Sequence, residues 1–192
     1  MGLPLYHISN DTNNIIKEFV PRIPTDPTFL GENKSIPRIC VSLSISGAFT
    51  GKPKFVSEKI LGEIYRVYEF DVDYPNNQSL VDYRTLYENE YVIDALLSKE
   101  YWITENIKPT KTYLIKITKL SQELVPVIKY SKIKHYLDIL ENDPDNSDKW
   151  LEENGGMLQV GFDKLEWINL DNNNKTGTDY NSINSYWTYK NK

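Results

Sequence analysis

The chain has little of the residues that most disulfide and metal sites require. Cys40 is the single cysteine, so no disulfide can form within the chain, and this favours a reducing compartment such as the cytoplasm. The two histidines, His7 and His135, form no zinc-binding spacing with that cysteine. We therefore predict that the chain holds no metal.

Long apolar runs and excess positive charge are also lacking. No segment approaches the roughly 18 apolar residues that span a bilayer, and the first residues lack the basic and apolar regions of a signal peptide, so we expect no membrane association. The net charge is −5, which disfavours a nucleic acid as partner. The glycine motifs GxGxxG and GxxxxGK, which cradle phosphates, are absent.

The composition is that of a protein with one hydrophobic core. With 192 residues, of which 40% are hydrophobic, the chain suits a single domain over 1–192. An Asn-rich segment, 169–192, ends it. The aromatic residues of that segment allow it to dock, whereas its polar residues favour flexibility.

Hydrophobic patterns predict more strand than helix. Strands are expected at 5–9, 65–74, 100–103 and 112–118, a strand leading into a turn or short helix at 38–49, and a closing strand pair at 157–170. Helical turns are expected at 9–20, an amphipathic helix at 129–142 and a short helical turn ended by glycine at 150–156. Prolines make 20–38 a stiff loop, and 79–98 suits either helix or strand. This is an α+β fold with a mainly β core of split or mixed antiparallel sheets and a few short helices.

A succession of short motifs carries the functional signal. In order, they are YHIS, PRIP, GEN, PRICVSLSISG and VIDALLSKEYWITENIKP. This order resembles a group of small phage-encoded proteins related to the ADP-ribosyltransferase superfamily, over roughly residues 5 to 118. The resemblance implies an ADP-ribosyltransferase-like fold and NAD as the substrate.

The resemblance also assigns residues. It implies that His7 occupies the first-strand position that holds NAD, and that Ser42 or Ser44 occupies the second motif. A late carboxylate then assists rupture of the bond between nicotinamide and ribose, and Glu100 matches this third position. The neighbouring Tyr6 and Ser9 belong to the same first motif.

The carboxylate has an alternative. Glu88 and Glu90 form an E-x-E spacing that resembles another branch of the superfamily. We prefer Glu100 because it begins a convincing strand, which holds a side chain rigidly.

The chemistry of NAD suits several other residues. Arginine binds pyrophosphate in a bidentate manner, so Arg22 and Arg38 are candidate clasps. Tyr6 or Trp102 is a candidate for stacking against nicotinamide. The structural alternative is that His7 is a packed core residue and that both arginines anchor loops through backbone carbonyls.

Two functions stay open from the sequence. The first is NAD-dependent mono-ADP-ribosylation of a host protein, in host takeover or counter-defence. The second is a non-catalytic binding protein that masks a host factor or holds a nucleotide, which the many tyrosines also suit. A lone cysteine inside an apolar strand is more often a core residue, which favours that interpretation of Cys40 over a nucleophile activated by His7.

Overall fold

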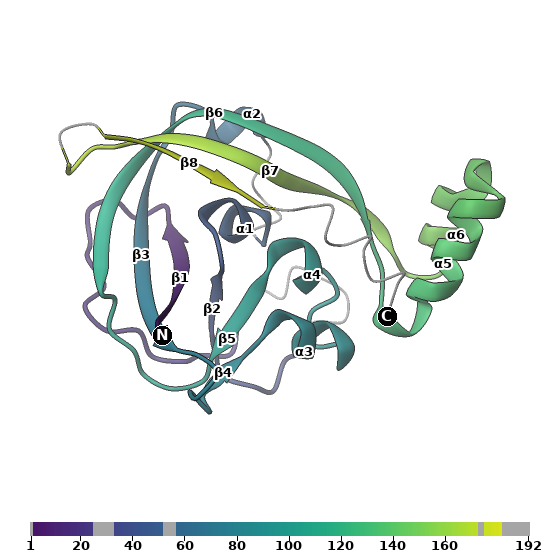
Figure 1. Ribbon diagram of the computed structural model, residues 1–192, viewed down its shortest axis with the longest axis horizontal. Coiled ribbons are helices and arrows are strands. Elements are labelled where there is room, and N and C mark those ends of the chain that lie inside the picture. Colours follow the sequence, from purple (N-terminus) through teal and green to yellow (C-terminus); the bar gives the residue numbers. More distant parts are fainter. Residues whose placement is uncertain (1, 25–32, 52–56, 173–174, 182–192) are drawn as a thin grey trace.

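One antiparallel sheet organises the computed structural model, which describes residues 2–24, 33–51, 57–172 and 175–181. Its strand order is β4-β5-β2-β1-β3-β6-β7-β8 (Figure 1). The strands are β1 (Gly2–Ser9), β2 (Ile39–Ser42), β3 (Ile64–Asp73), β4 (Leu80–Val81), β5 (Glu100–Ile103), β6 (Lys111–Val127), β7 (Met157–Asn169) and β8 (Lys175–Tyr180). The helices are α1 (Ile45–Thr50), α2 (Ser57–Ile60), α3 (Tyr83–Glu88), α4 (Ala95–Ser98), α5 (Tyr130–Asn142) and α6 (Ser147–Glu153), with a 3-10 turn, η1 (Pro144–Asn146). The predicted α+β class with a mainly β core is confirmed.

Strand β3 is buried on both faces because hydrophobic side chains occupy both of its alternating positions. Tyr65 and Val67 pack with α1 and α2 on one face of the sheet. Tyr68 and Phe70 pack on the other face, with residues of β2 and β5. Since successive strand residues point to opposite faces, this pattern requires cover on both sides of the sheet.

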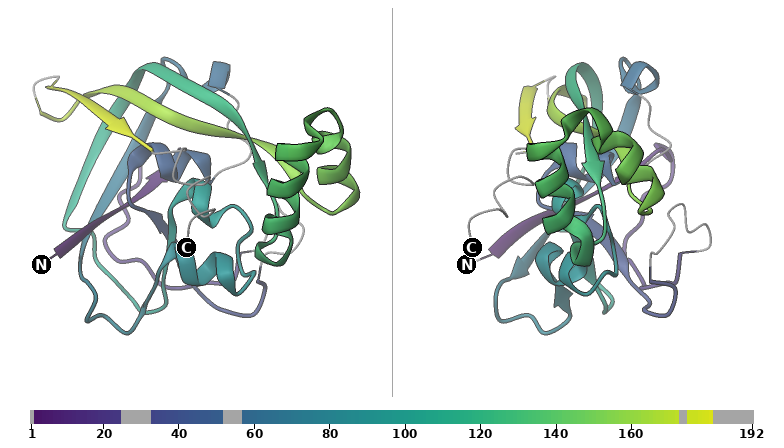
Figure 2. Two further views of the ribbon diagram at one scale, coloured as in Figure 1. Left: turned by 45° about the vertical axis from the view of Figure 1, so that its right-hand side comes forward. Right: turned by 90° about the vertical axis from the view of Figure 1, so that its right-hand side faces the viewer.

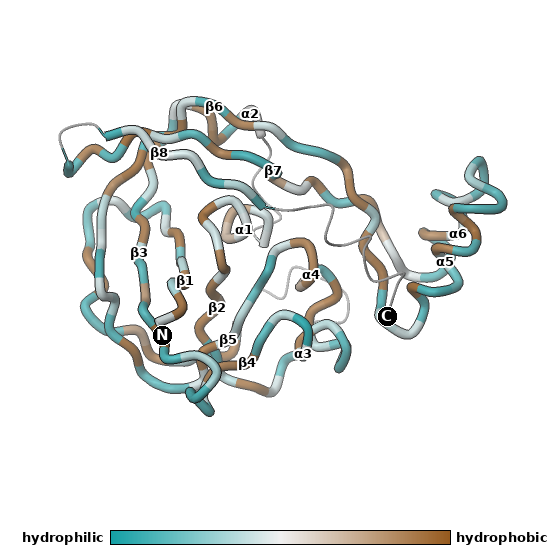
Figure 3. The backbone as a smooth tube through the Cα atoms, viewed as in Figure 1, coloured by the Kyte–Doolittle hydropathy of each residue, from teal (hydrophilic) through white to brown (hydrophobic). Residues whose placement is uncertain are grey.

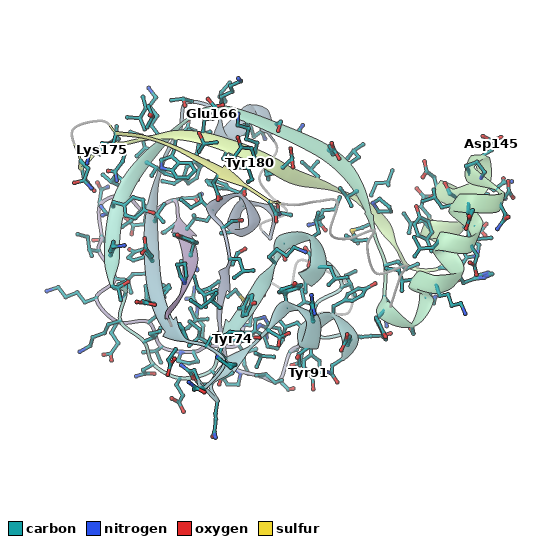
Figure 4. All side chains as sticks on the ribbon, in the orientation of Figure 1. Tyr74, Tyr91, Asp145, Glu166, Lys175 and Tyr180 are labelled. Carbon is teal, nitrogen blue, oxygen red and sulfur yellow. The ribbon has the colours of Figure 1, made fainter. Side chains whose placement is uncertain are left out.

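Strands β6 and β7 form a long arm that leads to the helices α5 and α6 (Figures 1 and 2). The segment predicted as a closing strand pair is a single strand, β7, because it pairs along its length with the still longer β6. Tyr130 at the start of α5 packs edge-on against Tyr87 of α3, with ring centroids 5.5 Å apart. Hydrophilic residues cover much of this helical extension, and Asp145 lies at its far end (Figures 3 and 4).

The predicted helical turns after β1 are wrong. The described chain over 10–18 is irregular. Asp11 Oδ1 accepts hydrogen bonds from the backbone N–H groups of Asn13 and Asn14, at 3.0 Å each, as a helix-capping side chain does, but no helix follows. The Tyr68 hydroxyl also accepts a hydrogen bond from the N–H of Ile16, at 3.1 Å, which ties the loop to the sheet.

Other expectations are met more closely. The strand followed by a short helix appears as β2 and α1, the amphipathic helix as α5, and the short helical turn as α6. The ambiguous segment forms α3 and α4 with the two-residue β4 before them. Part of the proline-rich loop, 25–32, and the end of the Asn-rich segment, 182–192, lie outside the described residues.

The sheet is split between β1 and β2. These strands share a single aligned pair, Tyr6 with Ser42, whereas β1 and β3 are aligned over all eight residues of β1. Helix α1 lies beside this split, between β2 and the β7–β8 pair (Figure 1). The split positions the candidate site.

Candidate functional site

A small pocket of about 60 Å³ lies where β1 and β2 separate. Its lining includes His7, Ser42, Gly47, Gly51, Ser98 and Glu100. Three of these are residues predicted for the motif positions of an NAD site: His7 for the first, Ser42 as one of the two candidates for the second, and Glu100 for the third. They come from β1, β2 and β5, so only the folded sheet brings them together.

Helix α1 forms one wall of the pocket and, at Gly47, lies very close to β2 and α4. A Cβ atom on Gly47 would lie 2.3 Å from Ser42 Oγ and 2.4 Å from the carbonyl oxygen of Ser98. A Cβ atom on Gly51 would instead lie 3.5 Å from Ser98 Cβ and 3.7 Å from Glu100 Oε2, in ordinary contact. Glycine is therefore required at position 47, whereas at 51 it leaves space beside Glu100.

Two serines of the segment SLSIS, Ser42 and Ser44, have different roles. Ser42 Oγ donates to the carbonyl of Ser98 at 2.6 Å and so ties β2 to α4. Ser44 caps α1, since its hydroxyl accepts a hydrogen bond from the N–H of Gly47 at 3.0 Å. Ser42 lines the pocket, whereas Ser44, the predicted alternative, caps the N-terminus of α1 and is not part of the lining.

Glu100 is held in place by a buried tryptophan. The indole Nε1 of Trp102 donates to Glu100 Oε1 at 2.7 Å. Trp102 itself is fully buried, stacked on Tyr91 at 5.9 Å between ring centroids, with the Arg38 guanidinium 4.0 Å from its ring centroid. These contacts occupy the ring, so Trp102 positions the carboxylate rather than offering a face for nicotinamide.

A left-handed residue precedes Glu100. Lys99 has a φ of 51° and turns the chain from α4 into β5, so that Ser98 and Glu100 both reach the pocket. A lysine in this backbone region carries strain of about 1–3 kcal/mol. Strain of this kind is concentrated at functional sites, which makes the turn part of the site's construction.

His7 lies at the split with a defined tautomer. Its Nδ1 lies 2.9 Å from the carbonyl oxygen of Cys40. Since a carbonyl can only accept, Nδ1 carries the hydrogen and Nε2 is the acceptor in the neutral ring. The ring packs edge-on against Phe19 at 5.2 Å and tilted against Tyr68 at 6.3 Å. His7 therefore bridges β1 and β2 as well as lining the pocket.

The two arginines predicted as pyrophosphate clasps are joined to each other through their backbones. Arg22 and Arg38 form an isolated antiparallel bridge. The Arg38 side chain is buried and donates to the carbonyls of Asn33 and Ile36, at 2.8 and 3.1 Å. Arg38 therefore anchors the loop, and the Arg22 side chain is exposed on that loop. Neither belongs to the pocket lining.

The remaining predicted residues also lie outside the lining. Tyr6 is half-buried next to the split, where burial, then Glu69 and Asp179, raise the pKa of its phenol. Ser9 accepts a hydrogen bond from the N–H of Asp11 at 3.1 Å and starts the loop after β1.

The alternative carboxylates are placed elsewhere. Glu88 is exposed at the end of α3. Glu90 accepts a hydrogen bond from the Ser131 hydroxyl and lies 3.4 Å from Lys129 Nζ, and these partners hold the pKa of its carboxyl below its usual range. Glu90 thus ties the end of α3 to α5, and of the three carboxylates only Glu100 is in the pocket lining.

Strands β7 and β8 fix α1 from its outer side. Asp179 Oδ2 accepts hydrogen bonds from the N–H and the hydroxyl of Ser46, at 2.7 and 3.0 Å. Thr50 Oγ1 accepts from the N–H of Phe162 at 3.0 Å. Burial raises the pKa of the Asp179 carboxyl, although its bonds to Ser46 act in the opposite direction. We refer to these contacts of Asp179 and Thr50 as the α1 clamp.

Sequence reasoning missed the glycines and the clamp. The spacing of Gly47 and Gly51 places them on the same face of a helix, four residues apart, and this pattern signals close approach to a neighbouring element. No local pattern marks Asp179, since it lies 133 positions from Ser46.

None of the helices in the described ranges is long and apolar enough to cross a membrane. Within the same ranges, no group of three or more His, Cys, Asp or Glu side chains is arranged to hold a metal ion. Comparison with known protein families, curated proteins and solved structures finds no match for this chain.

Proposed function

We propose that this chain is an ADP-ribosyltransferase-like protein that takes NAD as substrate at the pocket between β1 and β2 and modifies a host protein. One observation carries the proposal: His7, Ser42 and Glu100, which the motif order singled out, line the same pocket. Their positions in the sequence gave no assurance of this, because each lies on a different strand.

The proposed reaction breaks the bond between the nicotinamide nitrogen and the ribose carbon. The bonding electrons leave with nicotinamide, and positive charge develops on the ribose. The Glu100 carboxylate, held by Trp102, stabilises that charge and accepts the proton of the acceptor group as it bonds to the ribose carbon. His7 and Ser42 are proposed to orient the ribose and nicotinamide ends of the substrate.

The size of the pocket limits how NAD can enter. The pocket measures about 60 Å³, whereas pockets for drug-sized ligands measure about 300–1,000 Å³. The nicotinamide end is proposed to enter as α1 moves outward, with the remainder of NAD outside the pocket. The small volume is also the observation that favours the second candidate, a non-catalytic protein that masks a host factor.

Replacing the carboxylate tests the enzyme. The parent, Glu100→Gln and the matched surface control Glu88→Gln are incubated with labelled NAD and host lysate. Loss of a positioned acid–base group typically lowers rates by about 10²- to 10⁴-fold, so we expect this loss for Glu100→Gln and parent activity for Glu88→Gln. Equal labelling by parent and Glu100→Gln would contradict the assignment.

Filling the pocket separates binding from catalysis. Gly51→Ala adds a methyl group beside Glu100 and Ser98 without a clash, so it should weaken NAD binding in calorimetry without lowering the melting temperature. Absence of NAD binding by the parent, together with stable capture of one host protein, would overturn the enzyme in favour of the masking protein.

A further inference from the structure

Strand β8 leaves one edge of the sheet open. It is the last strand in the sheet order, and among the described strands it pairs only with β7, without a register shift (Figure 1). The strand at the opposite edge, β4, is two residues long and offers little backbone for pairing. Natural sheets usually protect an edge with a short strand, a proline, a bulge or a charge in the middle of the strand, and β8 has none of these.

The register of β7 and β8 shows which backbone groups of β8 face outward. The N–H of Asn181 donates to the carbonyl of Asp163 at 2.7 Å, which continues the aligned pairs of the two strands. Because hydrogen-bonded and non-bonded pairs alternate in an antiparallel ladder, Gly177 is bonded to β7, whereas the N–H and C=O groups of Thr176 and Thr178 point away from it. Among the described residues, these outward groups have no hydrogen-bond partner.

The side chains leave this edge accessible and place an aromatic ring at its centre. Thr176 and Thr178 are exposed. Gly177, between them, is aligned with the half-buried Trp167 of β7, and a Cβ atom on Gly177 would lie 2.5 Å from Cε2 of the tryptophan. The indole ring therefore lies directly over the middle of the edge strand.

The sequence of β8 is self-complementary when it is paired with itself in the antiparallel direction. The strand begins KTGTD, so a two-fold axis at Gly177 sets each threonine opposite a threonine and Lys175 opposite Asp179. Opposite charges and pairs of threonines stabilise an antiparallel ladder, whereas like charges directly opposite each other destabilise it. In this register no like charges meet, and the outward N–H and C=O groups of both threonines find partners in the second strand.

We propose that β8 pairs with β8 of a second copy of this chain, antiparallel and centred on Gly177, to form a two-fold dimer. The two glycines form a non-bonded pair, in which the Cα atoms approach to about 4.5 Å, and the lack of side chains leaves room for this approach. Each Trp167 ring lies over its own Gly177 and so meets the ring of the second copy near the axis. Because the same surface meets itself, the assembly closes at two copies. The proposal does not depend on NAD, since no residue of β8 lines the pocket.

Sedimentation equilibrium of the full chain, from micromolar to submillimolar concentration, tests the dimer. The parent should reach twice its mass of 22.4 kDa. A variant with Thr176→Lys and Thr178→Lys sets lysine opposite lysine at two pairs, so it should dimerise about tenfold more weakly or worse. The matched control, Gln122→Lys with Leu124→Lys, adds two lysines at alternate exposed positions of β6 and should dimerise as the parent does. All four positions are exposed, so both variants should keep the melting temperature of the parent.

A mixed sample tests the register. Thr176→Glu with Thr178→Glu should also dimerise weakly alone, and mixing it with the lysine variant should restore a dimer with one copy of each, because every glutamate then faces a lysine. This heterodimer would support the axis at Gly177. A parent that stays monomeric at every concentration overturns the proposal, as does a lysine variant that dimerises like the parent. Glutamate and lysine variants that fail to associate with each other overturn the register.

Discussion

Gly47 is the residue on which the geometry of the pocket depends most directly. In Gly47→Ala, the new methyl group would lie 2.3 Å from Ser42 Oγ and 2.4 Å from the backbone carbonyl of Ser98. The carbonyl belongs to the backbone and cannot rotate away, so α1 must move outward. The hydrogen bond from Ser42 to Ser98, at 2.6 Å, is lost or weakened as it does so.

The size of the effect follows from three contributions. Overpacking costs about 1–3 kcal/mol, and loss of the Ser42 bond adds about 1 kcal/mol. Alanine in place of glycine in a helix returns about 1 kcal/mol. The free energy of unfolding should therefore fall by about 1–3 kcal/mol. At about 2–4 °C per kcal/mol for a chain of this length, the melting temperature should fall by roughly 2–12 °C.

Thermal unfolding of Gly47→Ala beside Gly51→Ala provides the assay. Both variants add one methyl group to α1 or its end, but the methyl at Gly51 meets its neighbours at 3.5 Å or more. Gly51→Ala should melt with the parent, or slightly above it. A Gly47→Ala variant that melts with the parent would refute the argument that glycine is required for the close approach of α1.

Three further changes test neighbouring interactions. The first concerns Asp179, whose pKa is raised by burial, so the folded chain binds a proton on this carboxyl more tightly than the unfolded chain does. The free energy of unfolding that this proton contributes is fully present below about pH 3.9 and is lost as the pH rises through the folded pKa. Asp179→Asn keeps an acceptor for Ser46, so urea titrations should show it matching or exceeding the parent at neutral pH, with the gap closing in acid; a gap that widens in acid would contradict the sign. Trp102→Phe removes the donor to Glu100 and should lower the free energy of unfolding by about 1–3 kcal/mol in the same titrations, and no loss would show that the bond is dispensable. Tyr68→Phe should accelerate amide hydrogen exchange in the loop after β1 while β3 stays protected, and unchanged exchange would show that the hydroxyl does not hold the loop.

Much of the fold could be predicted from the sequence because local patterns decide it. The segment that forms β3 alternates between two hydrophobic faces, and α5 carries apolar residues at helical spacing. The failures arise where distant contacts dominate. The loop after β1 has helix-cap residues, but the hydroxyl of Tyr68, on distant β3, accepts a hydrogen bond from the N–H of Ile16, which a helix would bond to its own backbone.

The candidate site shows the same division. Motif order selected His7, Ser42 and Glu100, and all three line the pocket. The arginines were selected for their chemistry alone. Residue type does not reveal that the guanidinium of Arg38 donates hydrogen bonds to backbone carbonyls and lies over the ring of Trp102. Arginine serves equally well as a loop anchor and as a phosphate ligand, so only its neighbours in space distinguish the two.

The α1 clamp makes one wall of the pocket depend on residues in the C-terminal third of the chain. One wall of the pocket is α1, a helix of six residues, which is too short to be stable by itself. Its inner face meets β2 and α4 through Gly47, and its outer face is bonded to β7 and β8 through Thr50 and Asp179. These outer bonds join residues more than 100 positions apart, so the position of this wall depends on β7 and β8 as well as on the strands that precede them. The motifs that suggested the function all lie before β7, yet the pocket they line requires the strands that follow.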